Sequence, residues 1–204
     1  MLLDLHPDNP QPRNLKMVVE CLNDGGVVIY PTDTIYGIGC DILNTKAIEK
    51  ICRLKGLQPN KANLSFICQN LSELSNYTRN ISNPIYRILR SALPGPYTFI
   101  LEASRQVPKI LKTKKDTVGI RVPNHIICQN ILEGLGRPIL STSIPMGEEV
   151  EYYTDPEMMY ERFKNQTDIV INSGIGSMVA STVVDCTEGE VELIREGLGP
   201  WPIP

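Results

Sequence analysis

The stretch Gly25-Gly26-Val27-Val28-Ile29-Tyr30-Pro31-Thr32-Asp33-Thr34-Ile35-Tyr36-Gly37-Ile38-Gly39 decides the fold. Its first part, residues 27–30, is a short branched apolar run with glycines before it and Pro31 after it. This pattern predicts a buried strand that ends in an exposed turn. The following run, residues 31–39, carries two hydroxyls, one carboxylate, one phenol and two glycines. At the end of a buried strand, such a run can present side chains and backbone N–H groups to a ligand.

Two interpretations of Thr32-Asp33-Thr34 remain open from spacing alone. The three residues can line a binding site, or they can cap a turn through local hydrogen bonds. The run is not a Walker A loop, because no Gly-Lys-Ser/Thr follows, and its glycine spacing does not fit a dinucleotide fingerprint.

The rest of the chain alternates helical and extended patterns. Helices are expected at 14–23, 45–55, 71–74, 83–93 and 125–134, with Thr45 as the cap of the second. Strands are expected at 64–68, 97–101, 117–122, 138–143, 169–171, 181–185 and 191–195. Because helices and strands alternate early and strands dominate late, the sequence predicts an α/β fold with a mixed sheet. No repeat or low-complexity linker divides residues 1–204, so we expect a single domain.

Composition excludes several classes of protein. The chain has 204 residues, of which 42% are hydrophobic and 21% charged, which is typical of soluble globular proteins. Its apolar runs are far shorter than the roughly 20 residues of a membrane helix. The start, residues 1–7, lacks the basic and apolar parts of a secretory signal, so a cytoplasmic location is expected. Six dispersed cysteines and two histidines predict no metal site.

Charge is unevenly distributed along the chain. The formal net charge of -3 gives no general attraction to nucleic acid. Residues 104–115 nevertheless contain five basic side chains and no acid, whereas residues 148–161 contain six acids and no base. The basic stretch can be a solvated face or a patch that contacts RNA, and both interpretations stay open.

Several ordered motifs give the chain a family resemblance. The run 25–39 resembles the opening signature of the YrdC/YciO family, and Lys55-Gly56 stands at the family's first basic motif. The other matching motifs are Pro94-Gly95-Pro96-Tyr97-Thr98, Val118-Gly119-Ile120-Arg121-Val122-Pro123, Pro138 to Ser143, Ser181-Thr182-Val183-Val184-Asp185 and Ile194-Arg195-Glu196-Gly197.

The resemblance implies a twisted open sheet with helices on its faces and a concave basic cavity. This fold and its cavity are similar to those of the threonylcarbamoyl-AMP synthases. These enzymes join L-threonine, bicarbonate and ATP with Mg²⁺, release pyrophosphate and supply the threonylcarbamoyl group for tRNA modification. No tightly bound cofactor is expected. Carried over by position, Thr32, Tyr36 and Lys55 would bind the amino acid and carboxylate, and the nucleotide would contact Arg121, Ser141, Ser143, Ser181 and Arg195.

These residue types also suit the chemistry. Attack of a carboxylated amine on an α-phosphorus brings anions together, so a useful site supplies cations and hydrogen-bond donors where charge accumulates. Lysine offers a compact charge, and arginine offers a planar fork that matches phosphate. No acid-base pair is strictly required, which agrees with the position of His6 and His125 outside the best motifs.

Two departures separate the chain from the synthase pattern. The synthases carry Lys-x-Arg at the first basic motif, where this chain has Leu57, and Ser-x-Asn where it has Ser143-Ile144-Pro145. Loss of both hydrogen bonds would cost roughly 2 to 4.5 kcal/mol, or about thirtyfold to two-thousandfold in rate or affinity. With residues 51–53 and 141–143, these departures resemble the YciO branch. Arg53 is one candidate to replace the missing guanidinium, provided that the helix has ended by Lys55.

The sequence therefore leaves two classes of function open. One is an enzyme that binds an adenine nucleotide and L-threonine and makes, or reverses, threonylcarbamoyl transfer in tRNA metabolism. The other is a module that binds tRNA or double-stranded RNA through phosphate contacts without catalysis. A small regulatory nucleotide binder is a third possibility, and no catalytic residue is assigned.

Overall fold

The computed structural model describes residues 1–58, 64–111, 116–144, 153–187, 189–201 and 203. Its strands form one ten-stranded sheet in the order β1-β8-β2-β3-β7-β4-β6-β5-β9-β10. The strands are β1 (Leu2–Asp4), β2 (Val28–Tyr30), β3 (Gly37–Asp41), β4 (Ser65–Ile67), β5 (Tyr97–Glu102), β6 (Thr117–Arg121), β7 (Ile139–Ser143), β8 (Ile169–Asn172), β9 (Thr182–Asp185) and β10 (Glu192–Arg195).

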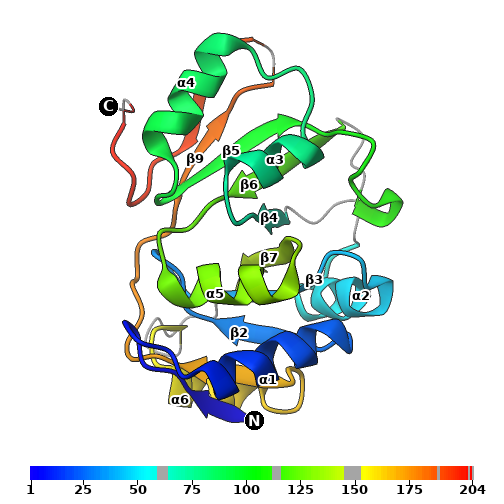
Figure 1. Cartoon of the computed structure of the whole chain (residues 1–204), viewed down its shortest axis with the longest axis vertical. Helices are drawn as coiled ribbons and strands as arrows, with labels where there is room; N and C mark the ends of the chain where they lie inside the picture. The colour runs from blue at the N-terminus through cyan, green and yellow to red at the C-terminus, as the bar shows by residue number, and fades with distance from the viewer. Residues whose placement is uncertain (59–63, 112–115, 145–152, 188, 202, 204) are drawn as a thin grey trace.

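The sheet is mixed, which confirms the expected fold class. Strands β1 and β2 run parallel to β8, β4 runs parallel to β6, and β5 runs parallel to β9. The other neighbours are antiparallel, including the β2/β3 hairpin, in which Ile29 lies opposite Ile38. In the view of Figure 1 the sheet has a lower and an upper half. The lower half contains β1, β2, β3, β7 and β8, and the upper half contains β4, β5, β6 and β9.

Helices cover the sheet on both faces (Figure 1). They are α1 (Pro12–Asn23), α2 (Thr45–Leu54), α3 (Leu71–Tyr77), α4 (Asn83–Ala92), α5 (Ile126–Leu135) and α6 (Pro156–Phe163). Along β2, Val28 and Tyr30 belong to one apolar cluster with α1 and α5, whereas Ile29 belongs to a second cluster with α2, α3, α4 and α6. Because successive strand residues point to opposite faces, the two clusters lie on opposite sides of the sheet.

Most expected elements are present, with informative differences. The second helix begins one residue after its cap, which is Asn44 rather than Thr45: the Asn44 side chain accepts the backbone N–H of Ala47 at 3.0 Å. Strands β1 and β3 and helix α6 were not expected. The sequence of β3 predicts a turn, because its glycines weaken a strand pattern. Helix α6 overlaps the acidic stretch, whose described part is residues 153–161. Asp155 caps this short helix, and the acidic composition hides its helical pattern in the sequence.

The glycines of β3 make room for a side chain. Tyr30 is buried and donates its hydroxyl to Ser141 Oγ at 2.6 Å, so its ring crosses β3 to reach β7. A methyl group on Gly39 would lie 3.0 Å from the Tyr30 ring and 2.8 Å from the carbonyl oxygen of Leu140. A methyl group on Gly37 would lie 3.1 Å from Ser141 Oγ. Gly37 and Gly39 therefore permit the close approach that a larger residue would obstruct.

Within the described residues, no helix has both the length and the apolar character that a bilayer span requires.

Candidate functional site

A cavity of about 680 Å³ opens over strands β3, β7, β4, β6, β5 and β9. Along β5, Tyr97, Phe99 and Leu101 point into an apolar cluster, whereas Thr98 and Ile100 line the cavity. The same alternation recurs in β6 and β4, so one face of these strands packs into the apolar cluster and the other lines the cavity. The polar lining includes Ser65, Thr98, Thr117, Ser141, Ser143 and Ser181.

Arg121 lies on the cavity wall at the end of β6. Its guanidinium is nearly buried and donates Nη2 to Asp33 Oδ1 at 2.8 Å and to Thr34 Oγ1 at 2.8 Å. Both partners come from the turn after β2. The Nε of Arg121 is also buried, and no group among the described residues accepts its hydrogen. A buried charged donor without an acceptor is costly, so this atom suits a ligand that brings an acceptor into the cavity.

Arg195 reaches the same cavity from β10. Its Nη2 donates to the carbonyl oxygen of Ser181 at 2.8 Å, and Thr98 and Ser181 share a hydrogen bond of 2.8 Å between their hydroxyls. Burial and the nearby charge of Arg121 lower the pKa of Arg195. The repulsion between these two guanidiniums would fall if an anion lay between them.

Lys55 lies beside the cavity at the end of α2. Its Nζ donates to the Ser143 carbonyl oxygen at 3.0 Å and approaches Ser143 Oγ at 3.4 Å. These partners carry no formal charge, and burial lowers the pKa of the Lys55 amine. Ser143 itself is exposed on the cavity wall. Lys55 thus offers a cation at the β7 side of the cavity, while Arg195 offers one at the β9 side.

The hydroxyls of Tyr36 and Thr32 both make hydrogen bonds within the protein. Tyr36 lines the cavity, but its hydroxyl donates to the carbonyl oxygen of Gly174 at 2.8 Å, and burial raises its pKa to about 12. The Thr32 hydroxyl donates to the Ile35 carbonyl oxygen at 2.7 Å and accepts the backbone N–H of Thr34 at 3.0 Å. It therefore caps the turn, and it is not among the residues that line the cavity. Its part in substrate binding stays a prediction.

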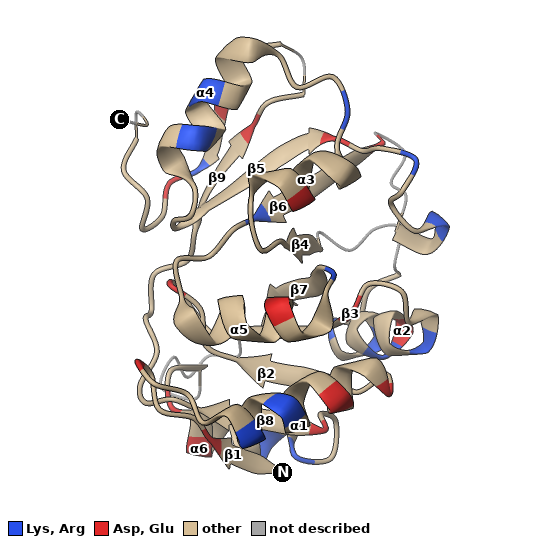
Figure 2. Ribbon diagram, in the orientation of Figure 1, with Lys and Arg blue, Asp and Glu red and all other residues tan. Residues whose placement is uncertain are grey.

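The cavity is cationic although the whole chain is acidic. Its described lining contains Arg121 and Arg195 and no Asp or Glu, with Lys55 at its edge. Figure 2 marks basic residues in blue on the ribbon of β6 and on that of α2. The structure therefore gathers Tyr36, Arg121, Ser141, Ser143, Ser181 and Arg195 on one wall, with Lys55 beside them. Their roles toward ligands remain predictions.

The sequence assigns no individual role to three residues that hold this site. Asp33 and Thr34 accept hydrogen bonds from Arg121, and Tyr30 donates a hydrogen bond to the Ser141 hydroxyl. All three lie within the motif run 25–39, but nothing in the spacing shows which strand they face. A signal for the cavity floor did exist. The alternation of Thr98 and Ile100 with large apolar residues in β5 marks one strand with two different faces.

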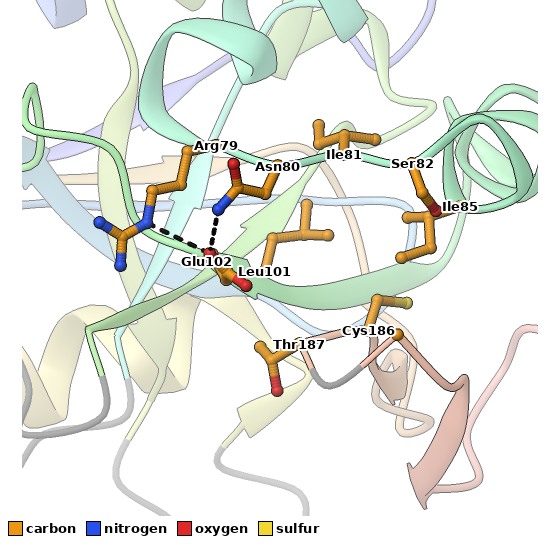
Figure 3. Close-up of a pocket in the computed structure, with 10 residues that line it drawn as sticks. Arg79, Asn80, Ile81, Ser82, Ile85, Leu101, Glu102, Cys186 and Thr187 are labelled. Atoms are coloured by element: carbon orange, nitrogen blue, oxygen red, sulfur yellow. Dashed lines mark hydrogen bonds and ion pairs between the residues drawn. The ribbon is translucent and has the colours of Figure 1, made fainter.

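A second hollow of about 380 Å³ lies between the α3–α4 connection and the end of β9 (Figure 3). Glu102 accepts hydrogen bonds there from Arg79 Nε at 3.2 Å and from Asn80 Nδ2 at 2.7 Å, and Arg79 also pairs with Asp116. The floor is apolar and includes Ile85, Leu101 and Cys186. Because the charged groups already satisfy one another, the larger cavity is the candidate site.

Comparison with known proteins agrees with the order of motifs. The model of the Sua5/YciO/YrdC family, described as telomere recombination, matches residues 20–197. The chain belongs to this family. It is 41% identical over 196 residues to the uncharacterized protein YciO of Escherichia coli K12, covering 96% of this chain and 94% of that protein. It is 30% identical over 186 residues to a threonylcarbamoyl-AMP synthase of Vibrio vulnificus, covering 90% and 98%.

Solved structures of the family share the fold. The crystal structure of E. coli YciO matches with a TM-score of 0.93 and 39% identity, over 100% of this chain and 99% of that one. The structure of P. abyssi Sua5 complexed with L-threonine matches with a TM-score of 0.88 and 26% identity, over 98% of this chain and 58% of that one. The expected resemblance to the family, with greater similarity to YciO than to the synthase, is confirmed.

Of the two departures from the synthase motifs, the structure describes the one at Leu57 but not the one at Pro145. Leu57 follows the end of α2 and is 45% exposed. Helix α2 does end at Leu54, but Arg53 is exposed and is not among the residues that line the cavity, so the structure does not support it as a replacement guanidinium. Pro145 lies outside the described residues, as do Lys112, Lys114 and Lys115 of the basic stretch. In its described part, Arg105 and Lys109 are exposed.

Proposed function

We propose that the cavity binds an adenine nucleotide together with L-threonine, and that the protein makes or reverses threonylcarbamoyl transfer in tRNA metabolism. The observation that carries this proposal is the convergence of Arg121 and Arg195 on one cavity whose described wall contains no acid. Planar guanidiniums match phosphate and carboxylate oxygens. The relatives named as threonylcarbamoyl-AMP synthases, and the Sua5 structure with L-threonine, support the same choice of ligands.

The positions of the cations suit a ligand with negative groups at both ends. Lys55 meets Ser143 on β7, and Arg195 meets Ser181 beside β9, with β4, β6 and β5 between them. Four strand spacings correspond to about 19 Å along the sheet, and the side chains reach inward from both sides. An amino-acid carboxylate at Lys55 and a phosphate at Arg121 and Arg195 would occupy these two ends. The neutral hydroxyls on the floor would hydrogen-bond the atoms between.

In this proposal the residues act by positioning and by charge. During synthesis, a carbamate oxygen of carboxylated threonine attacks the α-phosphorus of ATP, the new P–O bond forms, and pyrophosphate leaves with Mg²⁺ as part of the substrate. Arg121 and Arg195 would stabilise the charge that accumulates on the α-phosphate. Lys55 would hold the substrate carboxylate. Removal from tRNA would be a separate transfer. A phosphate oxygen of bound AMP attacks the carbamoyl carbon, the bond from that carbon to the adenosine nitrogen of tRNA breaks, and that nitrogen takes up a proton.

The direction of the reaction is decided by two assays. In the first, the protein is mixed with ATP, Mg²⁺, L-threonine and bicarbonate, and pyrophosphate is measured. In the second, threonylcarbamoyl-modified tRNA is incubated with the protein and AMP, and both loss of the modification and formation of threonylcarbamoyl-AMP are measured. We expect activity in one assay, reduced at least tenfold in Arg195→Ala and unchanged in Arg13→Ala, which alters an exposed arginine of α1. Inactivity in both assays, together with no binding of AMP or L-threonine, would reject the proposal.

RNA binding without catalysis is the second candidate, and the exposed Arg105 and Lys109 favour it. Binding through 6–10 phosphate contacts falls by roughly 10³ to 10⁵ between about 50 and 200 mM salt, whereas binding of a small ligand responds less. Steep salt dependence of tRNA affinity without any change in the tRNA would favour this candidate over the enzyme.

A further inference from the structure

The carboxylate of Asp33 is held at both of its oxygens. Its Oδ1 accepts Arg121 Nη2 at 2.8 Å, and its Oδ2 accepts the backbone N–H of Asn124 at 3.0 Å. The side chain of Asp33 is 9% exposed and that of Arg121 is 11% exposed. The ion pair therefore lies in a largely dry environment, where a charge-assisted hydrogen bond is stronger than at the surface.

The loop that carries Asp33 is itself fixed. The Thr32 hydroxyl bonds to the backbone at Thr34 and Ile35, and this ties the two residues that flank Asp33. The Thr34 hydroxyl also accepts a hydrogen bond from Arg121 Nη2 at 2.8 Å. Two acceptors from one short turn thus hold the same guanidinium nitrogen.

This arrangement leaves another part of the guanidinium available. Both side-chain hydrogen bonds of Arg121 to described residues come from Nη2, while its Nε is buried without an acceptor among those residues. A guanidinium is planar and rigid, so fixing Nη2 also fixes the direction of the other N–H groups. We propose that Asp33 is a positioning residue, which orients Arg121 so that its remaining donors meet the anionic group of the ligand.

This inference rests on the proposed function, because it presumes that an anion binds at Arg121. The alternative that the experiment tests is an ion pair that serves only the stability of the fold. The two roles give different results in a double-mutant cycle. If Asp33 acts through Arg121, its removal affects ligand binding only while Arg121 is present.

The experiment measures the affinity of AMP by calorimetry for the full chain and for Asp33→Ala, Arg121→Ala and the double variant. We expect Asp33→Ala to weaken AMP binding about tenfold in the otherwise unchanged protein and less than twofold in the Arg121→Ala background. Asp33→Asn keeps the shape and one acceptor, so it should recover part of the loss. It also replaces Asp33→Ala in the cycle if the alanine variant does not fold. The matched control is Asp168→Ala, which removes a carboxylate that pairs with Lys50 away from the cavity.

Chemical rescue covers the case in which Arg121→Ala binds AMP too weakly for the cycle. Guanidinium ion at low millimolar concentration should restore binding to Arg121→Ala but not to the double variant, with sodium chloride as the salt control. An equal loss from Asp33→Ala in both backgrounds, or rescue that does not need Asp33, would overturn the inference while leaving the proposed function intact. If the unchanged protein does not bind AMP, the proposed ligand and this inference are both rejected.

Discussion

At the scale of single residues, one buried tyrosine links the opening motif to the cavity floor. Tyr30 leaves β2, crosses Gly37 and Gly39, and donates its hydroxyl to Ser141 on β7. In that hydrogen bond Ser141 is the acceptor, so its own proton can point elsewhere, and among the described residues it meets the Ile38 carbonyl oxygen at 3.5 Å. A ligand oxygen would be a better acceptor at normal hydrogen-bond length.

Tyr30→Phe should therefore lower the free energy of unfolding by about 1 kcal/mol, because it removes one buried hydrogen bond without opening a large cavity. Chemical denaturation with urea measures the change. Tyr86→Phe is the control, since Tyr86 is 43% exposed on α4, and its effect should stay within about 0.5 kcal/mol. Equal effects of the two substitutions would contradict the role given to the Tyr30 hydroxyl.

A second prediction at this scale concerns the charge on Lys55. Burial lowers the pKa of its amine below the ordinary 10.5, so the amine loses its proton at a lower pH than an exposed lysine does. Because the neutral amine no longer attracts an anion, L-threonine affinity should fall as pH rises from 8 toward 10.5. Calorimetric titrations across this range test the idea. Lys55→Met should bind weakly with a flatter pH profile, while Lys16→Met should behave like the unchanged protein.

At the scale of elements, the end of α2 determines where Lys55 lies. The Leu57 N–H bonds to the Cys52 carbonyl oxygen and the Gly56 N–H to that of Arg53, which together form a Schellman motif. Gly56 takes the left-handed conformation that this motif needs, with φ of 64°. The motif stops the helix beside β7, so the Lys55 amine can reach Ser143.

Gly56→Ala should destabilise the protein by about 1–2 kcal/mol, because an alanine is strained in the left-handed region even where no atom obstructs its methyl group. It should also weaken L-threonine binding through displacement of Lys55. Gly136→Ala is a matched control: Gly136 ends α5 with φ of 68° and has equally open surroundings. We expect similar thermal destabilisation from both and a loss of affinity from Gly56→Ala alone. A loss of affinity in both would show that general destabilisation is the cause.

At the scale of the whole molecule, one arginine joins segments that are distant in the sequence. Arg137 donates to both carboxylate oxygens of the buried Asp41, to Asn23 Oδ1 and to the Leu135 carbonyl oxygen. It thereby connects the ends of α1 and α5 to β3. The pKa of Arg137 is raised, chiefly by its hydrogen bond to Asp41.

Arg137→Met should cost roughly 3 kcal/mol of unfolding free energy, since it leaves the Asp41 carboxylate buried without its cation. The double variant Arg137→Met with Asp41→Asn should lose less than the single variant, because it removes the uncompensated charge. Denaturation curves of both variants provide the comparison. A double variant that is the less stable of the two would mean that packing, rather than charge, explains the loss.

The class of the fold, most of its elements and the family follow from the amino-acid sequence alone. Periodicity locates a buried strand or an amphipathic helix because those signals come from neighbours along the chain, as in residues 27–30 or 83–93. Such local signals failed at β3, where glycines suit a loop as well as a strand that a tyrosine crosses.

The tertiary structure decided how the motif residues divide between ligand-facing and supporting positions. Within Thr32-Asp33-Thr34, the first hydroxyl closes the turn, whereas the next two residues hold an arginine that is 88 and 87 positions away. Lys55 and Ser143 likewise meet across 88 positions. Strand order and register bring these groups together, and both depend on the packing of the whole sheet rather than on any spacing within a motif.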